Sequence, residues 1–131
     1  MTGLPDDLLF TAEHEWVRSD SSTSARVGVT AHLVAELGGV DYVSLPTVGM
    51  SVLAGDSCGE LESTKPASEI FEVYAPVSGI IVSVNEAVTE DPELLGEDPY
   101  GDGWLFDIEL TDQDELSDLL DADAYAEQLD E

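Results

Sequence analysis

Glycine, proline and small polar residues interrupt this chain so often that its apolar residues form only short runs. Gly49, Gly55, Pro76 and Gly79 divide the central region in this way. Short runs in which apolar and polar residues alternate are typical of strands. The clearest of these runs are residues 13–18, 25–30, 40–45 and 104–110. The pattern predicts a mainly β (α+β) fold, in which residues 13–18 and 25–30 form a hairpin.

Helices are expected to be few and short. Thr30 is positioned to cap a helix over residues 31–37, which Gly38 and Gly39 would end. Residues 90–96 predict one helical turn, with proline near its start and glycine at its end. From Thr111 onward the apolar spacing becomes helical. Residues 46–49 and 76–79 resemble each other on either side of the chain's centre, which suggests a pseudo-symmetric pair of small sheets.

The charge is strongly one-sided. The 131 residues contain 30 Asp and Glu but only 3 Lys and Arg, so the net charge is −27. Nucleic acid and anionic membranes are poor partners for such a chain, because phosphate binding needs cationic contacts. We expect a single domain over residues 1–131, a monomer, whose stability rises with salt.

The sequence gives no sign of export. Residues 1–7 lack the basic start and apolar segment of a signal peptide and the arginine-rich bias of a transit peptide. Cys58 has no second cysteine to pair with, which fits a reducing compartment, and we expect it to be a buried apolar residue. A cytoplasmic location is therefore expected, with a salt-rich cytoplasm as one possibility.

The sequence offers almost no catalytic or metal-binding chemistry. His14 and His32 are distant from each other along the chain, and Cys58 has no evident base. Residues 97–103 resemble a calcium loop but lack its ligand spacing, so a turn is expected there. Lys65, the only lysine, lies between two strand-like runs. An exposed lysine on a rigid turn suits a protein that carries a group attached to that amine.

Eight motifs then match one family in order along nearly the whole chain. They are EHEWV at 13–17, VGVT at 27–30, ESTK at 62–65, APVSG at 75–79, VNE at 84–86, DPEL at 91–94, DPYGDGWLF at 98–106 and LLDADAY at 119–125. On these motifs the chain resembles the H protein of the glycine cleavage system, a lipoyl-carrier protein. The resemblance implies a hammerhead, or barrel-sandwich hybrid, of two small antiparallel sheets with short helices and a C-terminal helix.

The resemblance also implies a function. Lys65 would carry lipoic acid in amide linkage, attached by a lipoylating enzyme. The lipoyl arm would take an aminomethyl group from pyridoxal-phosphate-dependent glycine decarboxylase to a folate-dependent aminomethyltransferase. An FAD-containing dihydrolipoyl dehydrogenase would then reoxidise the dithiol. The chain itself would be no enzyme. By position, Glu15, Glu69 and Glu13 are candidates to hold the loaded arm, with Glu15 the foremost, and the alternative for each is an ordinary surface acid.

The segment after Lys65 departs from the family pattern. Pro76 follows Lys65 by eleven residues, about three more than is usual in the family. The extra residues could lengthen the hairpin or bulge its return strand. Pro66 also stands where a small residue is common.

Three other functions remain open on sequence alone. One is a lipoyl carrier of another pathway, such as sulfur oxidation. A second is an unmodified interaction module of the same fold. A third is a biotin carrier, which would usually have methionines beside its lysine, whereas Thr64 and Pro66 flank Lys65.

Overall fold

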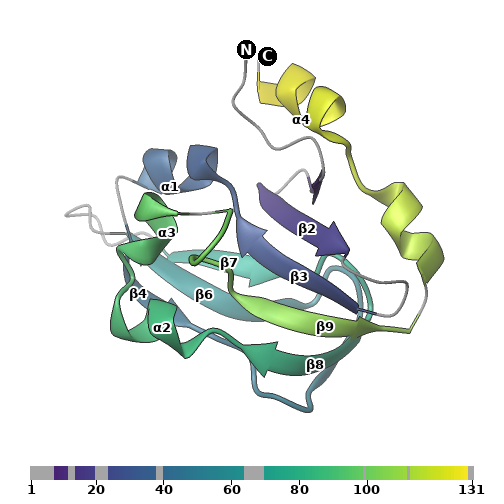
Figure 1. Ribbon diagram of the computed structural model, residues 1–131, viewed down its shortest axis with the longest axis horizontal. Coiled ribbons are helices and arrows are strands. Elements are labelled where there is room, and N and C mark those ends of the chain that lie inside the picture. The colour runs from purple at the N-terminus through teal and green to yellow at the C-terminus, as the bar shows by residue number, and fades with distance from the viewer. Residues whose placement is uncertain are drawn as a thin grey trace.

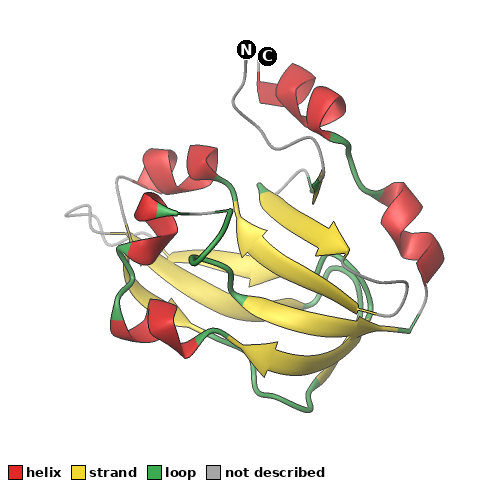
Figure 2. Cartoon of the chain, in the orientation of Figure 1, coloured by secondary structure: helices red, strands yellow, loops and turns green. Residues whose placement is uncertain are grey.

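A computed structural model describes residues 8–11, 14–19, 24–37, 40–63, 70–98, 100–111 and 113–129 of the chain. These residues form two antiparallel sheets with short helices at their margins (Figures 1 and 2). The strands are β1 (Leu9–Phe10), β2 (Glu15–Ser19), β3 (Ser24–Val29), β4 (Val40–Ser44), β5 (Ser51–Val52), β6 (Ser57–Ser63), β7 (Ile70–Tyr74), β8 (Gly79–Val84) and β9 (Phe106–Leu110). The helices are α1 (Ala31–Leu37), α2 (Glu86–Glu90), α3 (Leu94–Glu97), the 3-10 helix η1 (Gln113–Asp118) and α4 (Ala122–Leu129).

The larger sheet has six strands in the order β1-β2-β3-β9-β8-β5, and the smaller has three in the order β4-β6-β7. Figure 1 shows the smaller sheet behind the larger one. The predicted fold class and the hairpin of β2 and β3 are therefore confirmed. Residues 46–49 and 76–79 both lead into the larger sheet, where β5 pairs antiparallel with β8, and the pseudo-symmetry stays a prediction.

The main core lies between the two sheets. Successive residues of a strand point to opposite faces of the sheet, so every second residue points into the core, and these residues are mostly apolar. Val27 and Ile108 of the larger sheet are fully buried in the same cluster as Leu61 and Val73 of the smaller sheet. This packing fixes the position of β6 and β7 relative to the rest of the molecule.

A second, smaller core covers the outer face of the larger sheet. It contains Leu8, Phe10, Trp16, Ala122 and Tyr125, so it joins β1 and β2 to α4. The rings of Phe10 and Tyr125 stack with centroids 4.8 Å apart. The backbone of Phe10 also exchanges two 2.7 Å hydrogen bonds with that of Leu120.

The helices agree with the sequence only in part. Helix α1 begins after Thr30, whose Oγ1 accepts a hydrogen bond from the Leu33 amide at 3.3 Å, as predicted. The single helical turn predicted over residues 90–96 corresponds to α3, which begins at Leu94 and continues to Glu97, so Gly96 lies inside the helix rather than at its end. The start of α2 was missed, although the Asn85 side chain caps it by accepting from the Ala87 amide. The C-terminal helical region is also two pieces, η1 and α4.

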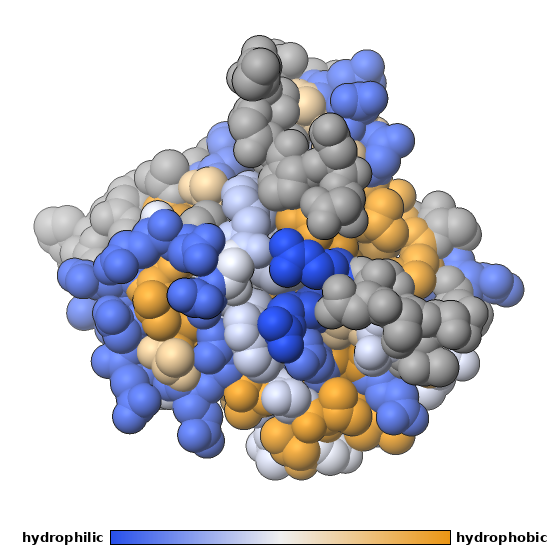
Figure 3. Space-filling view, in the orientation of Figure 1, coloured by the Kyte–Doolittle hydropathy of each residue, from blue (hydrophilic) through white to orange (hydrophobic). Residues whose placement is uncertain are grey.

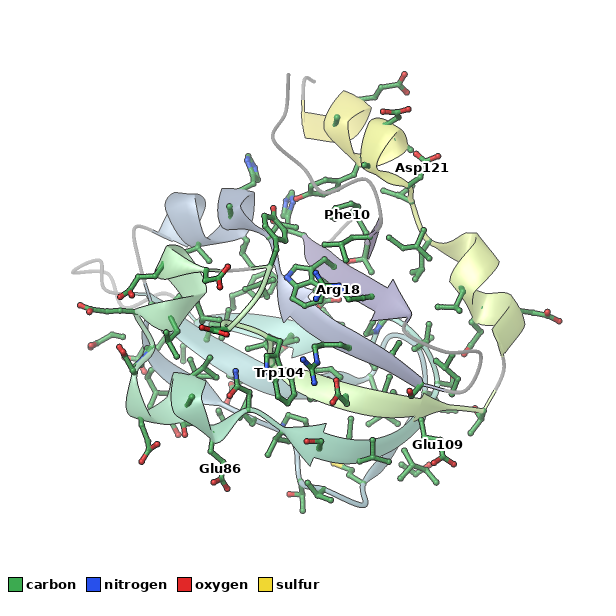
Figure 4. All side chains as sticks on the ribbon, in the orientation of Figure 1. Phe10, Arg18, Glu86, Trp104, Glu109 and Asp121 are labelled. Carbon is green, nitrogen blue, oxygen red and sulfur yellow. The ribbon has the colours of Figure 1, made fainter. Side chains whose placement is uncertain are left out.

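Both described arginines lie on the larger sheet, where Arg18 of β2 is paired with Arg26 of β3. Figure 3 shows strongly hydrophilic side chains near the middle of the face that this view presents. Arg26 donates to both carboxylate oxygens of Asp107, at 2.9 and 3.2 Å, and stacks 4.0 Å over the Trp104 ring. Arg18, labelled near Trp104 in Figure 4, donates to the Tyr100 carbonyl at 3.0 Å. These contacts bind the guanidinium groups to neighbouring residues of the same chain.

Candidate functional site

Strands β6 and β7 form the hairpin that the sequence predicted around Lys65. They pair antiparallel, with Glu62 opposite Ile70, Leu61 opposite Phe71 and Glu60 opposite Glu72. Lys65 and Glu69 belong to residues 64–69, which connect these strands and lie outside the described residues. The structure thus shows the strand before Lys65 and the strand after it, and the role of Lys65 as an attachment point stays a prediction.

The extra residues do not bulge the return strand. From Ile70 to Val73 the pairing of β7 with β6 runs without a shift. The irregularity lies on β6, where Cys58 falls between Ser57, opposite Tyr74, and Gly59, opposite Val73. Residues 63–69 separate the last paired residues, which is longer than the two to five residues of most hairpin connections. Of the two alternatives, the pairing favours the longer hairpin.

Glu15 is not a surface acid, because only 1% of it is exposed. Its Oε2 accepts a hydrogen bond from the Tyr74 amide at 2.6 Å, and its Oε1 accepts from the Thr11 hydroxyl at 3.4 Å. Hydrogen-bond donors of this kind offset the free-energy cost of burying a carboxylate away from water. Glu15 therefore joins β2 of the larger sheet to the end of β7 in the smaller one. The predicted contact between Glu15 and a loaded arm stays a prediction.

Backbone hydrogen bonds hold Thr11 and His14 close to one another and to Glu15. The Thr11 amide donates to the Glu15 carbonyl at 2.9 Å, and the His14 amide donates to the Thr11 carbonyl at 3.1 Å. His14 has a positive φ of 68°, which a non-glycine residue adopts rarely. Glu13, the third predicted arm contact, lies outside the described residues.

The two histidines, distant in sequence, come together in the structure. The rings of His14 and His32 have centroids 4.9 Å apart. His14 Nδ1 lies 2.6 Å from the Tyr125 hydroxyl, which also lies 3.0 Å from Thr30 Oγ1. Sequence spacing could not reveal this group, because Tyr125 reaches it from the other end of the chain. The contacts attach α4 to His14, the residue next to Glu15.

Cys58 is a buried residue of the core, as predicted, with 5% of it exposed. Burial, together with the nearby carboxylates of Glu15 and Asp56, raises the pKa of its thiol from 9.0 to about 12. The thiol is therefore protonated at neutral pH and is a poor nucleophile.

No group of three or more His, Cys, Asp or Glu side chains in the described ranges is arranged to hold a metal ion. None of the described helices is long and apolar enough to cross a membrane. Residues 100–103 form a turn after α3, and the Asp102 amide donates to the Asp98 carboxylate at 3.0 Å.

These features define a class of protein: a small β-rich domain of the barrel-sandwich type, with a hairpin that leads into a single lysine. The family model described as Glycine cleavage H-protein matches residues 8–131. The chain belongs to the glycine cleavage H-protein family, whose members are carrier components rather than catalysts.

Relatives and a solved structure agree with this assignment. The glycine cleavage system H protein of Kocuria rhizophila is 51% identical over 131 residues, covering 99% of this chain and 100% of that protein. The protein of the same name from Enterobacter sp. is 48% identical over 126 residues, covering 96% and 95%. The crystal structure of a glycine cleavage system H protein from Mycobacterium marinum is 42% identical, with a TM-score of 0.86, covering 98% and 100%.

Proposed function

We propose that this chain is the lipoyl-bearing carrier of a glycine cleavage system and that Lys65 is its attachment residue. The observation that carries the proposal is the β6–β7 hairpin, whose paired strands lead into and out of the segment that contains the only lysine. Because Lys65 is the only side-chain primary amine in the chain, the choice of attachment residue is unambiguous. Residues 1–131 would form one carrier domain that works in the cytoplasm.

The described residues would hold both ends of the segment that carries the arm in fixed positions. Pairing up to Glu62 and Ile70 fixes both ends of the connecting segment. The bond from the Tyr74 amide to Glu15 fixes the return strand against the larger sheet. An arm that begins on such a support starts from a defined point, which lowers the entropy lost when its far end enters an active site.

Bound lipoic acid would supply a disulfide that cycles to a dithiol and carries a one-carbon amine between enzymes. The role of this chain is to present that group, not to react. Glu15, Glu69 and Glu13 are the residues that we propose to hold a positively charged cargo. A carboxylate near an ammonium in a partly shielded place stabilises it.

The carrier would visit glycine decarboxylase, the aminomethyltransferase and dihydrolipoyl dehydrogenase, after a lipoylating enzyme has modified it. All four enzymes would have to approach the same end of the smaller sheet, because the attachment segment leaves the sheet there.

Mass spectrometry of the protein from its native host tests the attachment directly. Since there is one lysine, a lipoyl mass on the intact chain, followed by peptide mapping, assigns the group to Lys65. We expect the lipoylated mass, and we expect Lys65→Arg to abolish it. An unmodified wild-type chain would instead support the interaction module, and a biotin mass would support the biotin carrier.

A second experiment tests the pathway. Lipoylated protein should support exchange of label between bicarbonate and glycine with cognate glycine decarboxylase, and Lys65→Arg should not. A lipoylated chain without exchange activity would indicate a carrier of another pathway. Exchange by Lys65→Arg would contradict the assigned residue.

A further inference from the structure

The hydroxyl of Tyr125 lies where three parts of the chain meet. It is 2.6 Å from Nδ1 of His14, just before β2, and 3.0 Å from Oγ1 of Thr30, just before α1. Tyr125 belongs to α4, and its side chain is fully buried. Its ring stacks on Phe10, so the packing of the second core holds the hydroxyl in place. One phenol group therefore joins α4 to the starts of β2 and α1.

His14 has a backbone conformation that depends on its neighbours. Its φ of 68° lies in the left-handed region, which is unfavourable for a residue with a side chain. The His14 carbonyl accepts a hydrogen bond from the Thr30 amide at 3.0 Å, and the His14 ring is bonded to Tyr125. Thr30 is also bonded to Tyr125 through its side chain, so the three residues hold one another in place.

The conformation of His14 sets the direction of the next side chain. Glu15 is buried, and its Oε2 accepts a hydrogen bond from the Tyr74 amide at 2.6 Å. Because the peptide bond between them is rigid, a rotation of the His14 backbone would move the Glu15 carboxylate away from that amide. Tyr74 is the last residue of β7, the return strand of the hairpin around Lys65. The contacts thus form a continuous path from the C-terminal helix to this hairpin.

We propose that Tyr125 is a positioning residue of the carrier. Its hydroxyl holds His14 in the left-handed conformation, and through Glu15 it fixes the return strand of the hairpin that contains Lys65. In Figure 1, α4 lies at the margin of the molecule, well away from β6 and β7, so Tyr125 acts through other residues. The importance of this path for glycine cleavage rests on the proposed function, whereas the path itself does not.

A firmly held return strand matters to a carrier because the arm starts beside it. If the end of the hairpin is loose, it must become ordered each time an enzyme binds the arm, and this ordering weakens binding. The chemical step takes place in the enzyme, after the arm has entered. Loss of the Tyr125 hydroxyl should therefore raise the KM for the carrier and leave kcat unchanged.

Hydrogen exchange at the Tyr74 amide tests the path in the unlipoylated protein. Tyr125→Phe removes the hydroxyl and keeps the ring that stacks on Phe10. Tyr100→Phe is the matched control, because the Tyr100 hydroxyl also accepts a hydrogen bond at the start of α1, from the Ala31 amide at 3.1 Å. We expect Tyr125→Phe to speed exchange at Tyr74 about two- to tenfold, the range of one ordinary hydrogen bond. The control should change it less than about twofold.

Double variants test whether the effect passes through Glu15 and His14. In a Glu15→Ala background the hydrogen bond to Tyr74 is already absent, so adding Tyr125→Phe should change exchange there by less than about twofold. His14→Gly breaks the bond to Tyr125 from its other end and leaves the second core unaltered. It should speed exchange at Tyr74 as well, and it tests the proposal even if Tyr125→Phe does not fold.

Two results of hydrogen exchange would overturn the proposal. One is an equal effect of Tyr125→Phe and Tyr100→Phe on the Tyr74 amide. The other is an effect of Tyr125→Phe that stays as large in the Glu15→Ala background as in wild type, because the path would then not pass through Glu15.

The functional part of the test uses the lipoylated chains in label exchange between bicarbonate and glycine with cognate glycine decarboxylase. Tyr125→Phe should raise the KM for the carrier about two- to tenfold and leave kcat within about twofold of wild type, and Tyr100→Phe should change neither. A fall in kcat at an unchanged KM would overturn the positioning role. Failure of the wild-type chain to be lipoylated would overturn the proposed function instead, and exchange at Tyr74 would still decide whether Tyr125 holds β7.

Discussion

The Oε2 atom of Glu15 lies 2.6 Å from the backbone nitrogen of Tyr74, so a buried carboxylate joins the start of β2 to the end of β7. One hydrogen bond thereby links the two sheets. It also fixes the return strand of the hairpin that leads to and from Lys65.

Replacing Glu15 with alanine should cost about 1–3 kcal/mol in the free energy of unfolding, because the Tyr74 amide loses its carboxylate partner. Glu15→Gln should cost less, since its amide oxygen can still accept the hydrogen bond. Chemical denaturation measures the stability, and hydrogen exchange should show faster exchange at Tyr74 in the alanine variant. An exposed control, Glu109→Ala, should remain within about 0.5 kcal/mol of wild type. Equal effects at the two positions would contradict the assigned role of Glu15.

Gly28 has no room for a side chain. A Cβ at this position would lie 2.5 Å from Cε2 and Cζ2 of the Trp16 ring, which is fully buried. We expect Gly28→Ala to destabilise the protein by about 1–3 kcal/mol through overpacking and to change the fluorescence of Trp16.

Gly96 provides the matched control. It lies inside α3, and a Cβ there would meet Val34 Cγ1 at an ordinary 3.6 Å. Gly96→Ala should therefore be neutral or stabilise the protein by up to about 1 kcal/mol. A loss of stability as large as that of Gly28→Ala would show that the crowding at Gly28 is not the cause.

Because the thiol of Cys58 is buried, we expect the folded protein to lose stability at high pH. The folded state raises the pKa of this thiol from 9.0 to about 12. Between those values the unfolded chain loses a proton that the folded chain keeps, so the free energy of unfolding falls as pH rises. The contribution of this group is at most about 1.4 kcal/mol per pH unit. Comparing wild type with Cys58→Ala from pH 8 to pH 11 isolates it from other titrating groups.

The same burial predicts slow alkylation of Cys58. At pH 8, iodoacetamide should label the thiol slowly in the folded protein and rapidly after denaturation. Fast labelling of the folded chain would show that the thiol is accessible and would contradict its place in the core.

Salt should stabilise this protein. With 30 acidic residues against 3 basic ones, repulsion within the folded state is strong at low ionic strength. Raising salt from about 0.1 M to about 1 M shortens the screening length from about 10 Å to about 3 Å. Thermal unfolding in chloride salts should shift upward over this range. A flat response would argue against a salt-rich setting for the protein.

Local sequence patterns correctly predicted those strands and helices whose formation depends on residues close together in the chain. The hairpin of β2 and β3 follows from alternation around a polar turn, and α1 follows from the Thr30 cap. Helix α2 was missed because its signal is a single asparagine cap before five residues. The pairing of β5 with β8 could not be predicted, because partner choice among strands depends on packing across the whole core, which local patterns do not contain.

The candidate site, too, has one feature that the sequence reveals and others that only the structure reveals. Lys65 is prominent because the composition makes it unique, and no geometry was needed to find it. The burial of Glu15 and its bond to Tyr74 could not be predicted, because the two residues lie 59 positions apart. The opposition of Glu60 and Glu72 depends on the hairpin register, which the extra residues after Lys65 made uncertain.

The arginines described above have a consequence for how copies of this protein behave toward one another. Arg18 is bonded to the Tyr100 carbonyl, and Arg26 is bonded to Asp107 and stacked on Trp104. Both guanidinium groups are thus already bonded within their own molecule. Copies therefore repel one another over several ångströms even when the protein is abundant. This repulsion opposes self-association, so each copy stays available to bind a different partner.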